Sequence, residues 1–147
     1  MITQEDKELL IKDLCARLPY SVKCCIYNFG DKTVRIKEDI LYSIQADNVL
    51  TLKSYTERNE AYMYHQIKPY LFPMSSMTEE QQNEFDRTYA NDMQVVSDNL
   101  KNRLDGQPYE INLGHYRHID WLNKNHFDYR GLIEKGLALD ATGLNIY

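Results

Sequence analysis

The chain has 147 residues, of which 43% are hydrophobic and 27% charged, and its formal net charge is -5. This composition predicts a single domain over residues 1–147 and excludes a disordered or fibrous chain. No run reaches the roughly 18 apolar residues of a membrane span, and the start lacks the basic-then-apolar order of a secretion signal, so we expect no membrane association.

The distribution of charged residues indicates which partners are disfavoured, and the cysteines indicate the cellular compartment. From Pro69 onward the chain has seven basic and twelve acidic residues, against ten and ten before it. An acidic half disfavours non-specific nucleic-acid binding, which needs a clustered positive surface. The cysteines Cys15, Cys24 and Cys25 are odd in number and two are adjacent, which indicates reduced thiols and a cytoplasmic protein.

A helix is predicted near the start, over residues 4–18. Thr3 and Asp6 fit a weak form of the capping box, in which a threonine and an acidic side chain bind each other's backbone amides. Leucines then recur at every fourth position (Leu10, Leu14 and Leu18). This spacing predicts an apolar face with the charged side chains opposite it, and Pro19 ends the helix.

Short alternating segments follow and predict a β-meander. Residues 21–27, 33–37, 40–46 and 49–55 alternate apolar and polar side chains, with turn residues between them. Connections of a few residues join antiparallel neighbours, so we expect about four antiparallel strands. The alternation predicts that Cys25 faces outward, where it is the one thiol worth testing as a nucleophile. The side chains expected to face the core are Val22, Cys24, Ile26, Val34, Ile36, Ile40, Tyr42 and Ile44.

Residues 61–78 join the meander to the second half of the chain. Residues 61–67 fit either a fifth strand or a turn of helix. Residues 68–78 predict a rigid crossover, because two prolines exclude helix while the apolar content is too high for a solvated linker. We expect its apolar side chains to fill the gap between sheet and helices; they are Tyr70, Leu71, Phe72, Met74 and Met77.

A long amphipathic helix is predicted over residues 79–104. Thr78 and Gln81 fit a capping box at its start. Apolar residues then recur at spacings of 4, 4, 3, 4 and 4 (Phe85, Tyr89, Met93, Val96, Leu100 and Leu104). At 1.5 Å per residue the helix is about 40 Å long, more than a domain of this size needs. We therefore expect part of the helix to overhang or to bind another chain, which favours a homodimer through residues 79–104.

The last third of the chain predicts a cap of loops and short helices. Residues 109–113 fit a short strand, residues 115–125 a helix, and residues 132–135 a helical turn closed by Gly136. We expect the chain after Thr142 to fray. The fold class is therefore α+β, with an N-terminal helix, an antiparallel β-meander, a long amphipathic helix and a helical or loop-rich C-terminal cap.

A polar and aromatic cluster between residues 115 and 130 allows an enzymatic interpretation. His115 and His118 are three apart, so a helix would place both on one face, and His126 or Asp128 could add a third group. This set fits a small hydrolase-type enzyme, with or without a metal. The alternative is that these histidines only bind backbone groups. The chain has no glycine-rich phosphate loop or nucleophile elbow, so we assign no cofactor and no metal.

We favour a second interpretation, a non-enzymatic binding or regulatory protein that acts through protein contacts. The long helix, the acidic second half and the 12 tyrosines suit an interface. A third interpretation, single-stranded nucleic-acid binding through tyrosine and arginine side chains, is disfavoured by the charge. The contact surface is expected at Asp120, Trp121, His126, Asp128, Tyr129 and Arg130.

Two longer stretches of the sequence are similar to a known family. They are residues 67–81, with the sequence IKPYLFPMSSMTEEQ, and residues 120–140, with the sequence DWLNKNHFDYRGLIEKGLALD. In both, the chain resembles a family of small uncharacterised proteins encoded by prophages and mobile elements of gut anaerobes. The resemblance covers about a quarter of the chain. It implies an origin in such an element and assigns no activity, cofactor or site residue; the long helix after Gln81 extends further than the shared stretches require.

Overall fold

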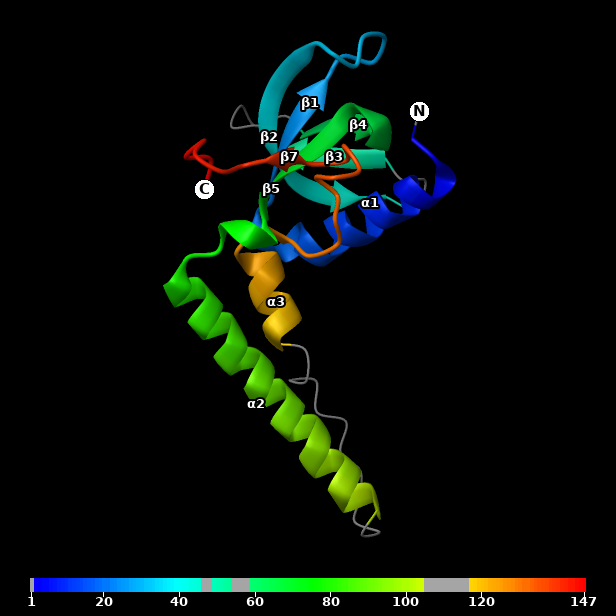
Figure 1. Cartoon of the computed structure of the whole chain (residues 1–147). Coiled ribbons are helices and arrows are strands. Elements are labelled where there is room, and N and C mark those ends of the chain that lie inside the picture. The colour runs from blue at the N-terminus through cyan, green and yellow to red at the C-terminus, as the bar shows by residue number, and fades with distance from the viewer. Residues whose placement is uncertain (1, 46–48, 54–58, 105–116) are drawn as a thin grey trace. The chain divides into compact units, whose positions relative to one another are not determined.

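The computed structural model describes residues 2–45, 49–53, 59–104 and 117–147 (Figure 1). The described residues form a mixed α+β fold with an N-terminal helix, a mainly antiparallel sheet, a long helix and a later short helix, as predicted. They fall into two compact units. The sheet unit comprises Met1–Met74 and His126–Tyr147, and the helical unit comprises Ser75–Asn125.

The predicted meander is present in the sheet unit. Its strands are β1 (Lys23–Tyr27), β2 (Arg35–Ile44), β3 (Val49–Lys53) and β4 (Asn59–Met63). Each pairs antiparallel with the next. A short 3-10 turn, η2 (Tyr64–Gln66), follows β4, so both interpretations of residues 61–67 hold in part, a strand end and then a helical turn.

The residues predicted as a rigid crossover are instead mostly a central strand. The strand β5 (Ile67–Pro73) pairs antiparallel with β1, and its other edge pairs in parallel with β6 (Phe127–Asp128) and β7 (Leu139–Asp140). A single 3-10 turn, η3 (Met74–Ser76), then leads to the long helix. Proline has no N–H for the strand ladder, and both prolines lie where a pairing ends: Pro69 is the last residue of β5 paired with β1, and Pro73 is the last residue of the strand. Within the described residues the strand order is β4-β3-β2-β1-β5-β6, with β7 also beside β5.

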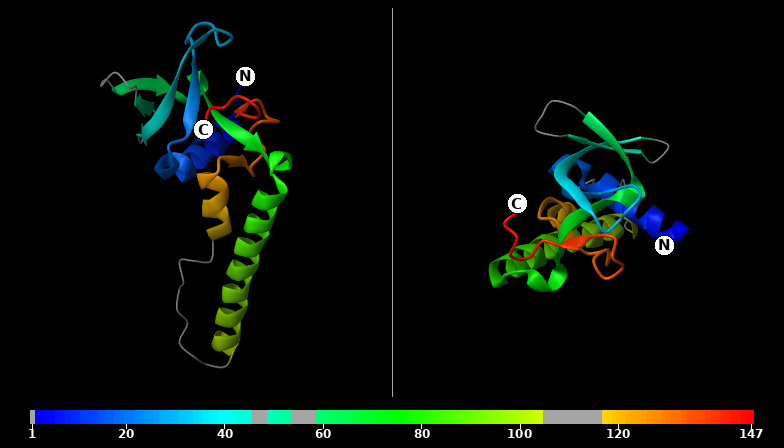
Figure 2. Two further views of the ribbon diagram at one scale, coloured as in Figure 1. Left: turned by 90° about the vertical axis from the view of Figure 1, so that its left-hand side faces the viewer. Right: turned by 90° about the horizontal axis from the view of Figure 1, so that it is seen from above.

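The helix α1 (Gln4–Arg17) covers one face of this sheet (Figure 2). Thr3 and Asp6 form the predicted capping box. Leu10 and Leu14 are fully buried in a core that includes Ile26 from β1 and Leu71 from β5. Burial of each such side chain contributes about 1.5–3 kcal/mol relative to leaving it exposed. The expectation that charged side chains lie opposite the apolar face is wrong at two positions, which form a buried ion pair described below.

The C-terminal residues cover the opposite face of the central strands. Cys25 is fully buried there in a cluster with Tyr70 and Ala141, so the prediction that its thiol faces outward is wrong. The reason is that β1 is an inner strand with both faces covered. The predicted fraying after Thr142 is also wrong, because the Tyr147 hydroxyl donates to the Tyr70 carbonyl at 2.8 Å.

Strand β2 differs from its prediction in length and in the face it buries. It is one strand of 10 residues where two short strands were predicted. Val34, Ile36 and Tyr42 are 48%, 51% and 53% exposed, whereas Leu41 is buried. The register explains this reversal: Ile26 of β1 pairs with Lys37, which places Lys37, Asp39 and Leu41 on the face that α1 covers.

The helical unit consists of α2 (Glu79–Leu104) and α3 (Arg117–Lys124). The predicted capping box at the start of α2 is present, since Thr78 and Gln81 exchange hydrogen bonds at 3.0 and 3.1 Å. The two helices lie side by side in the views of Figures 1 and 2. The strand predicted over residues 109–113 lies outside the described residues. No helix in the described part of the chain is long and apolar enough to span a membrane.

Candidate functional site

The histidine of α3, His118, is bound to α2. Its ring Nδ1 lies 2.6 Å from Oδ2 of Asp92, and its backbone N–H donates to the same oxygen at 2.8 Å. Both side chains are buried. Burial alone would raise the pKa of the Asp92 carboxyl, but the hydrogen bonds from His118 outweigh it and hold that pKa below its ordinary value. The contact therefore fastens α3 to α2 through Nδ1 and the backbone N–H of His118, and both bonds converge on one oxygen of Asp92.

Aromatic rings extend this contact along the apolar stripe of α2. The ring of Tyr89 lies 5.1 Å from that of His118, and the ring of Phe85 lies 5.8 Å from that of Trp121. Past these contacts the stripe is open to solvent, since Met93 and Val96 are 36% and 41% exposed, and Tyr89 itself is 47% exposed. The stripe predicted from the sequence is thus only partly used inside the helical unit.

The second described histidine of the candidate set, His126, belongs to the sheet unit. Its ring stacks on that of Tyr147, with centroids 3.6 Å apart and planes 11° from parallel. Burial, together with the charges of Arg17 and Lys23, lowers the pKa of His126 to about 4, so the ring is neutral at pH 7. Its buried Nδ1 has no hydrogen-bond partner among the described residues. His126 is therefore a neutral packing residue of the core.

Asp128 has a structural role in the same unit. Its carboxylate accepts hydrogen bonds from the backbone N–H of Leu132 at 2.9 Å and of Ile133 at 2.8 Å. These two contacts close the turn that follows β6, as aspartates commonly do. Both carboxylate oxygens are thus occupied, and the side chain is buried.

A buried charge network lies beside these residues and was missed in the sequence. Arg17 donates from Nε to Asp13 at 2.7 Å and from a terminal nitrogen to the Phe127 carbonyl at 2.6 Å, and both Asp13 and Arg17 are fully buried. Nε of Arg130 lies 3.3 Å from the same Asp13 carboxylate. The signal was available: Asp13 and Arg17 follow Leu10 by three and seven residues, which is the spacing of one helix face.

The described members of the candidate enzyme set are divided between the two units. His118 belongs to the helical unit, whereas His126 and Asp128 belong to the sheet unit. His115 lies outside the described residues. No group of three or more His, Cys, Asp or Glu side chains that could hold a metal ion occurs in the part of the chain that the structure describes.

The predicted contact surface between residues 120 and 130 is also divided between the units. In the helical unit, Asp120 is exposed and Trp121 is half-buried against Phe85. In the sheet unit, Tyr129 is half-buried and its hydroxyl accepts a hydrogen bond from Arg130 at 2.9 Å. His126 and Asp128 have the buried positions described above.

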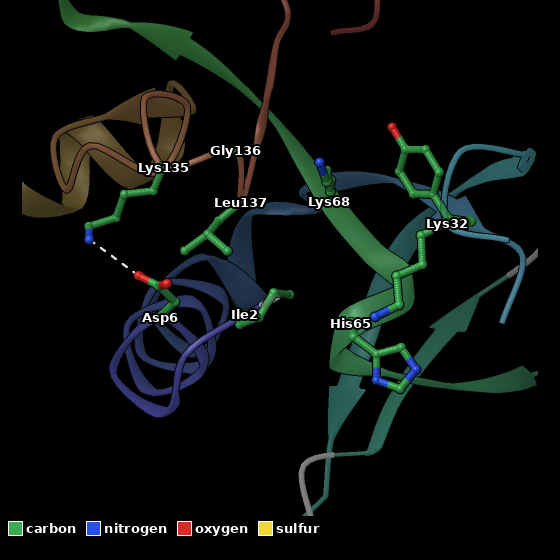
Figure 3. Close-up of a pocket in the computed structure, with 9 residues that line it drawn as sticks. Ile2, Asp6, Lys32, His65, Lys68, Lys135, Gly136 and Leu137 are labelled. Atoms are coloured by element: carbon green, nitrogen blue, oxygen red, sulfur yellow. Dashed lines mark hydrogen bonds and ion pairs between the residues drawn. The ribbon is translucent and has the colours of Figure 1, made fainter. Parts of the chain in front are cut away.

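A hollow of about 260 Å³ lies elsewhere on the sheet unit (Figure 3). We call it the lysine pocket, since Lys32, Lys68 and Lys135 contribute to its wall. Lys32 extends toward His65, and Lys135 toward Asp6 (Figure 3). The remaining residues that line it are Ile2, Tyr27, Gly136 and Leu137.

No protein-family model, curated protein or solved structure matches the chain.

Proposed function

We propose that the chain is a non-enzymatic binding or regulatory protein of a prophage or mobile element, which acts in the cytoplasm through protein contacts. Its first partner is a second copy of the chain, bound through α2. The observation that carries the proposal is the open end of the α2 stripe, where Met93 and Val96 stay exposed beyond the contact with α3. Exposed apolar side chains in a row along a long helix are typical of a contact surface.

The spacing of the stripe favours a second copy as the occupant. The series 4, 4, 3, 4 and 4 reads the same from both ends. In an antiparallel pair centred between Met93 and Val96, Met93 of each copy therefore lies level with Val96 of the other, and Tyr89 with Leu100. A surface that is complementary to itself in this way is what a two-fold dimer requires.

The charges of α2 favour the same orientation. Its start is acidic, with Glu79, Glu80 and Glu84, whereas Lys101 and Arg103 lie in the last turn. An antiparallel pair brings the basic end of each helix toward the acidic start of the other, and a parallel pair would bring like charges together. Complementary charges of this kind set orientation more than affinity.

The enzymatic alternative is less well supported. His118 binds Asp92 through Nδ1, an arrangement that a general base can use. Backbone amides bind both oxygens of Asp128, however, and His126 is stacked and neutral. Two of the three described members of the set therefore make structural contacts, and a general base needs to reach a substrate proton within hydrogen-bond distance.

Sedimentation velocity of the full chain tests the proposal. We expect a concentration-dependent dimer for the wild type and a monomer for Met93→Glu, because a charge at the centre of the pair would be buried without a partner. Asn91→Glu is the matched control, since Asn91 is exposed and lies on the opposite side of the helix. It should dimerise like the wild type.

Circular dichroism separates loss of pairing from loss of folding. Met93→Glu should keep the helical signal of the wild type, because Met93 is exposed in the single chain. A wild-type chain that stays monomeric across the concentration range, or a Met93→Glu variant that dimerises as well as Asn91→Glu, would overturn the second copy as the partner.

The proposed origin has its own test. The resemblance of residues 67–81 and 120–140 supports it, and genes of a mobile element or prophage are expected beside the gene of this chain. A neighbourhood made only of metabolic genes would count against this origin, whatever the outcome of the sedimentation experiment.

A further inference from the structure

The lysine pocket collects positive charge in an acidic protein. The net charge of the chain is -5, yet the pocket wall contains Lys32, Lys68 and Lys135 against the carboxylate of Asp6. These residues come from the loop before β2, from β5, from the turn before β7 and from α1. The fold thus brings them together from separate segments, and a run of basic residues in the sequence does not explain the cluster.

Asp6 neutralises only one of these lysines. Its carboxylate lies 3.2 Å from Nζ of Lys135, and the hydrogen bonds from Thr3 and Lys135 lower the pKa of Asp6, which keeps it charged. Within the described residues, neither Lys32 nor Lys68 forms an ion pair with a carboxylate. Lys68 lies over the ring of Tyr27, with Nζ 5.6 Å from the ring centroid, and this contact steadies its side chain at the pocket wall.

His65 responds to this unpaired charge. Partial burial and the charge of Lys32 lower the pKa of its imidazole. The titratable groups that line the pocket with it are the three lysines, Asp6 and Tyr27, and the rings of Phe29 and Tyr64 pack against the imidazole. An anion held between Lys32 and Lys68 would offset the positive charge, and the imidazole would regain affinity for a proton.

We propose that the lysine pocket binds the phosphate group of a small phosphorylated compound. A phosphate monoester carries close to two negative charges at pH 7, which matches the two lysines that lack a carboxylate partner. Lysines bind phosphate as point charges, without the two-pronged geometry by which arginine selects carboxylates. This recognition by side chains needs no glycine-rich loop, and the sequence contains none.

The volume and the apolar lining of the pocket indicate what the phosphate group is attached to. Its volume of about 260 Å³ is near the lower end of the range for small-molecule sites, which is roughly 300–1,000 Å³. Ile2 and Leu137 add apolar surface beside the lysines. The pocket thus has room for a phosphate with a small organic group, and a dinucleotide would be too large.

Calorimetric titration of the full chain tests the site with three probes: inorganic phosphate, glycerol 3-phosphate and acetate. We expect saturable binding of both phosphates, tighter for glycerol 3-phosphate, and much weaker binding of acetate. Acetate binding as tightly as phosphate would overturn phosphate as the ligand class. Glycerol 3-phosphate binding no tighter than inorganic phosphate would overturn the organic part of the assignment.

Substitution of the two lysines tests whether phosphate binds in the lysine pocket. The double variant Lys32→Gln/Lys68→Gln should bind phosphate at least about tenfold more weakly, since it removes both positive charges that lack a carboxylate partner. Lys12→Gln is the control, because Lys12 is an exposed lysine of α1 outside the pocket. Equal weakening in the control and the double variant would show non-specific attraction and refute the site. Both lysines are partly exposed, so thermal melting should show that the variants fold.

The titration of His65 checks whether the anion binds beside Lys32 and Lys68. In an NMR titration the pKa of His65 should rise when phosphate saturates the wild type, and should not respond in the double variant. An unchanged pKa of His65 at saturation would place the anion elsewhere. The Met93→Glu variant should bind phosphate like the wild type, so the outcome here is independent of the proposed dimer.

Discussion

From the burial of His126 we predict how much the free energy of unfolding falls in acid. His126 is buried, and its pKa is lowered from the ordinary value of 6.5 to about 4. Each pKa unit corresponds to about 1.4 kcal/mol, so the shift is equivalent to about 3 kcal/mol. At neutral pH the imidazole is uncharged in both folded and unfolded chains, and its contribution to stability is then at its maximum.

The sign of the effect follows from proton binding. As pH falls below about 6.5, the unfolded chain binds a proton at this position while the folded chain does not. The free energy of unfolding should therefore fall between about pH 6.5 and pH 4, and this histidine accounts for about 3 kcal/mol of the loss. His126→Asn should remove that part of the loss, since asparagine does not titrate and tolerates the positive φ of 62° at this position.

Urea unfolding at a series of pH values measures the effect. The free energy of unfolding of the wild type minus that of His126→Asn should shrink or reverse toward acid. The carboxylates titrate in both proteins, so their effect cancels in this difference. His65→Asn is the control for losing a histidine, and should keep most of the wild-type slope because His65 is only partly buried. Identical pH dependence of His126→Asn and the wild type would refute the reasoning.

Two other side chains allow further predictions of stability, both measurable by urea unfolding. Arg17→Met should lower the free energy of unfolding by about 3 kcal/mol, because the buried carboxylate of Asp13 loses its closest partner and keeps only the longer contact with Arg130. Adding Asp13→Leu should recover part of that loss, and a double variant no better than the single one would contradict this account. Phe72→Ala should cost about 2 kcal/mol, below the 3–5 kcal/mol of a fully buried phenylalanine, because Phe72 is only partly buried beside Phe127 and Tyr147. A cost near zero would show that these ring contacts do not stabilise the sheet edge.

Local patterns in the sequence predicted the helices and the meander well. The caps at Thr3 and Thr78 were correctly predicted because a capping box depends only on residues three apart. The antiparallel meander was correctly predicted because its turns are short. Both features are determined by neighbours along the chain, which a single sequence displays directly.

Features that depend on distant pairing were predicted less well. The strand β5 was interpreted as a crossover because its partners β6 and β7 lie more than 50 residues further along the chain. The buried face of β2 depends on its register with β1, and the alternation alone is compatible with either face. The burial of Asp13 and Arg17 was missed because charge was taken as a sign of exposure. The lysine pocket combines residues from separate segments and leaves no motif in the sequence.

The pairing at the edge of β5 also determines how the two units are connected. The backbone N–H of Phe72 donates to the His126 carbonyl at 2.8 Å, so the chain leaves the sheet unit and re-enters it at neighbouring points. The helical unit is in this sense an insertion between β5 and β6, and the entropy of closing such a connection changes only slowly with its length. During synthesis α2 can form as soon as it emerges, whereas the sheet unit stays open at β5 until residues 127–140 follow. Selection could therefore lengthen, shorten or exchange the helical unit while the sheet, with its lysine pocket, keeps its fold.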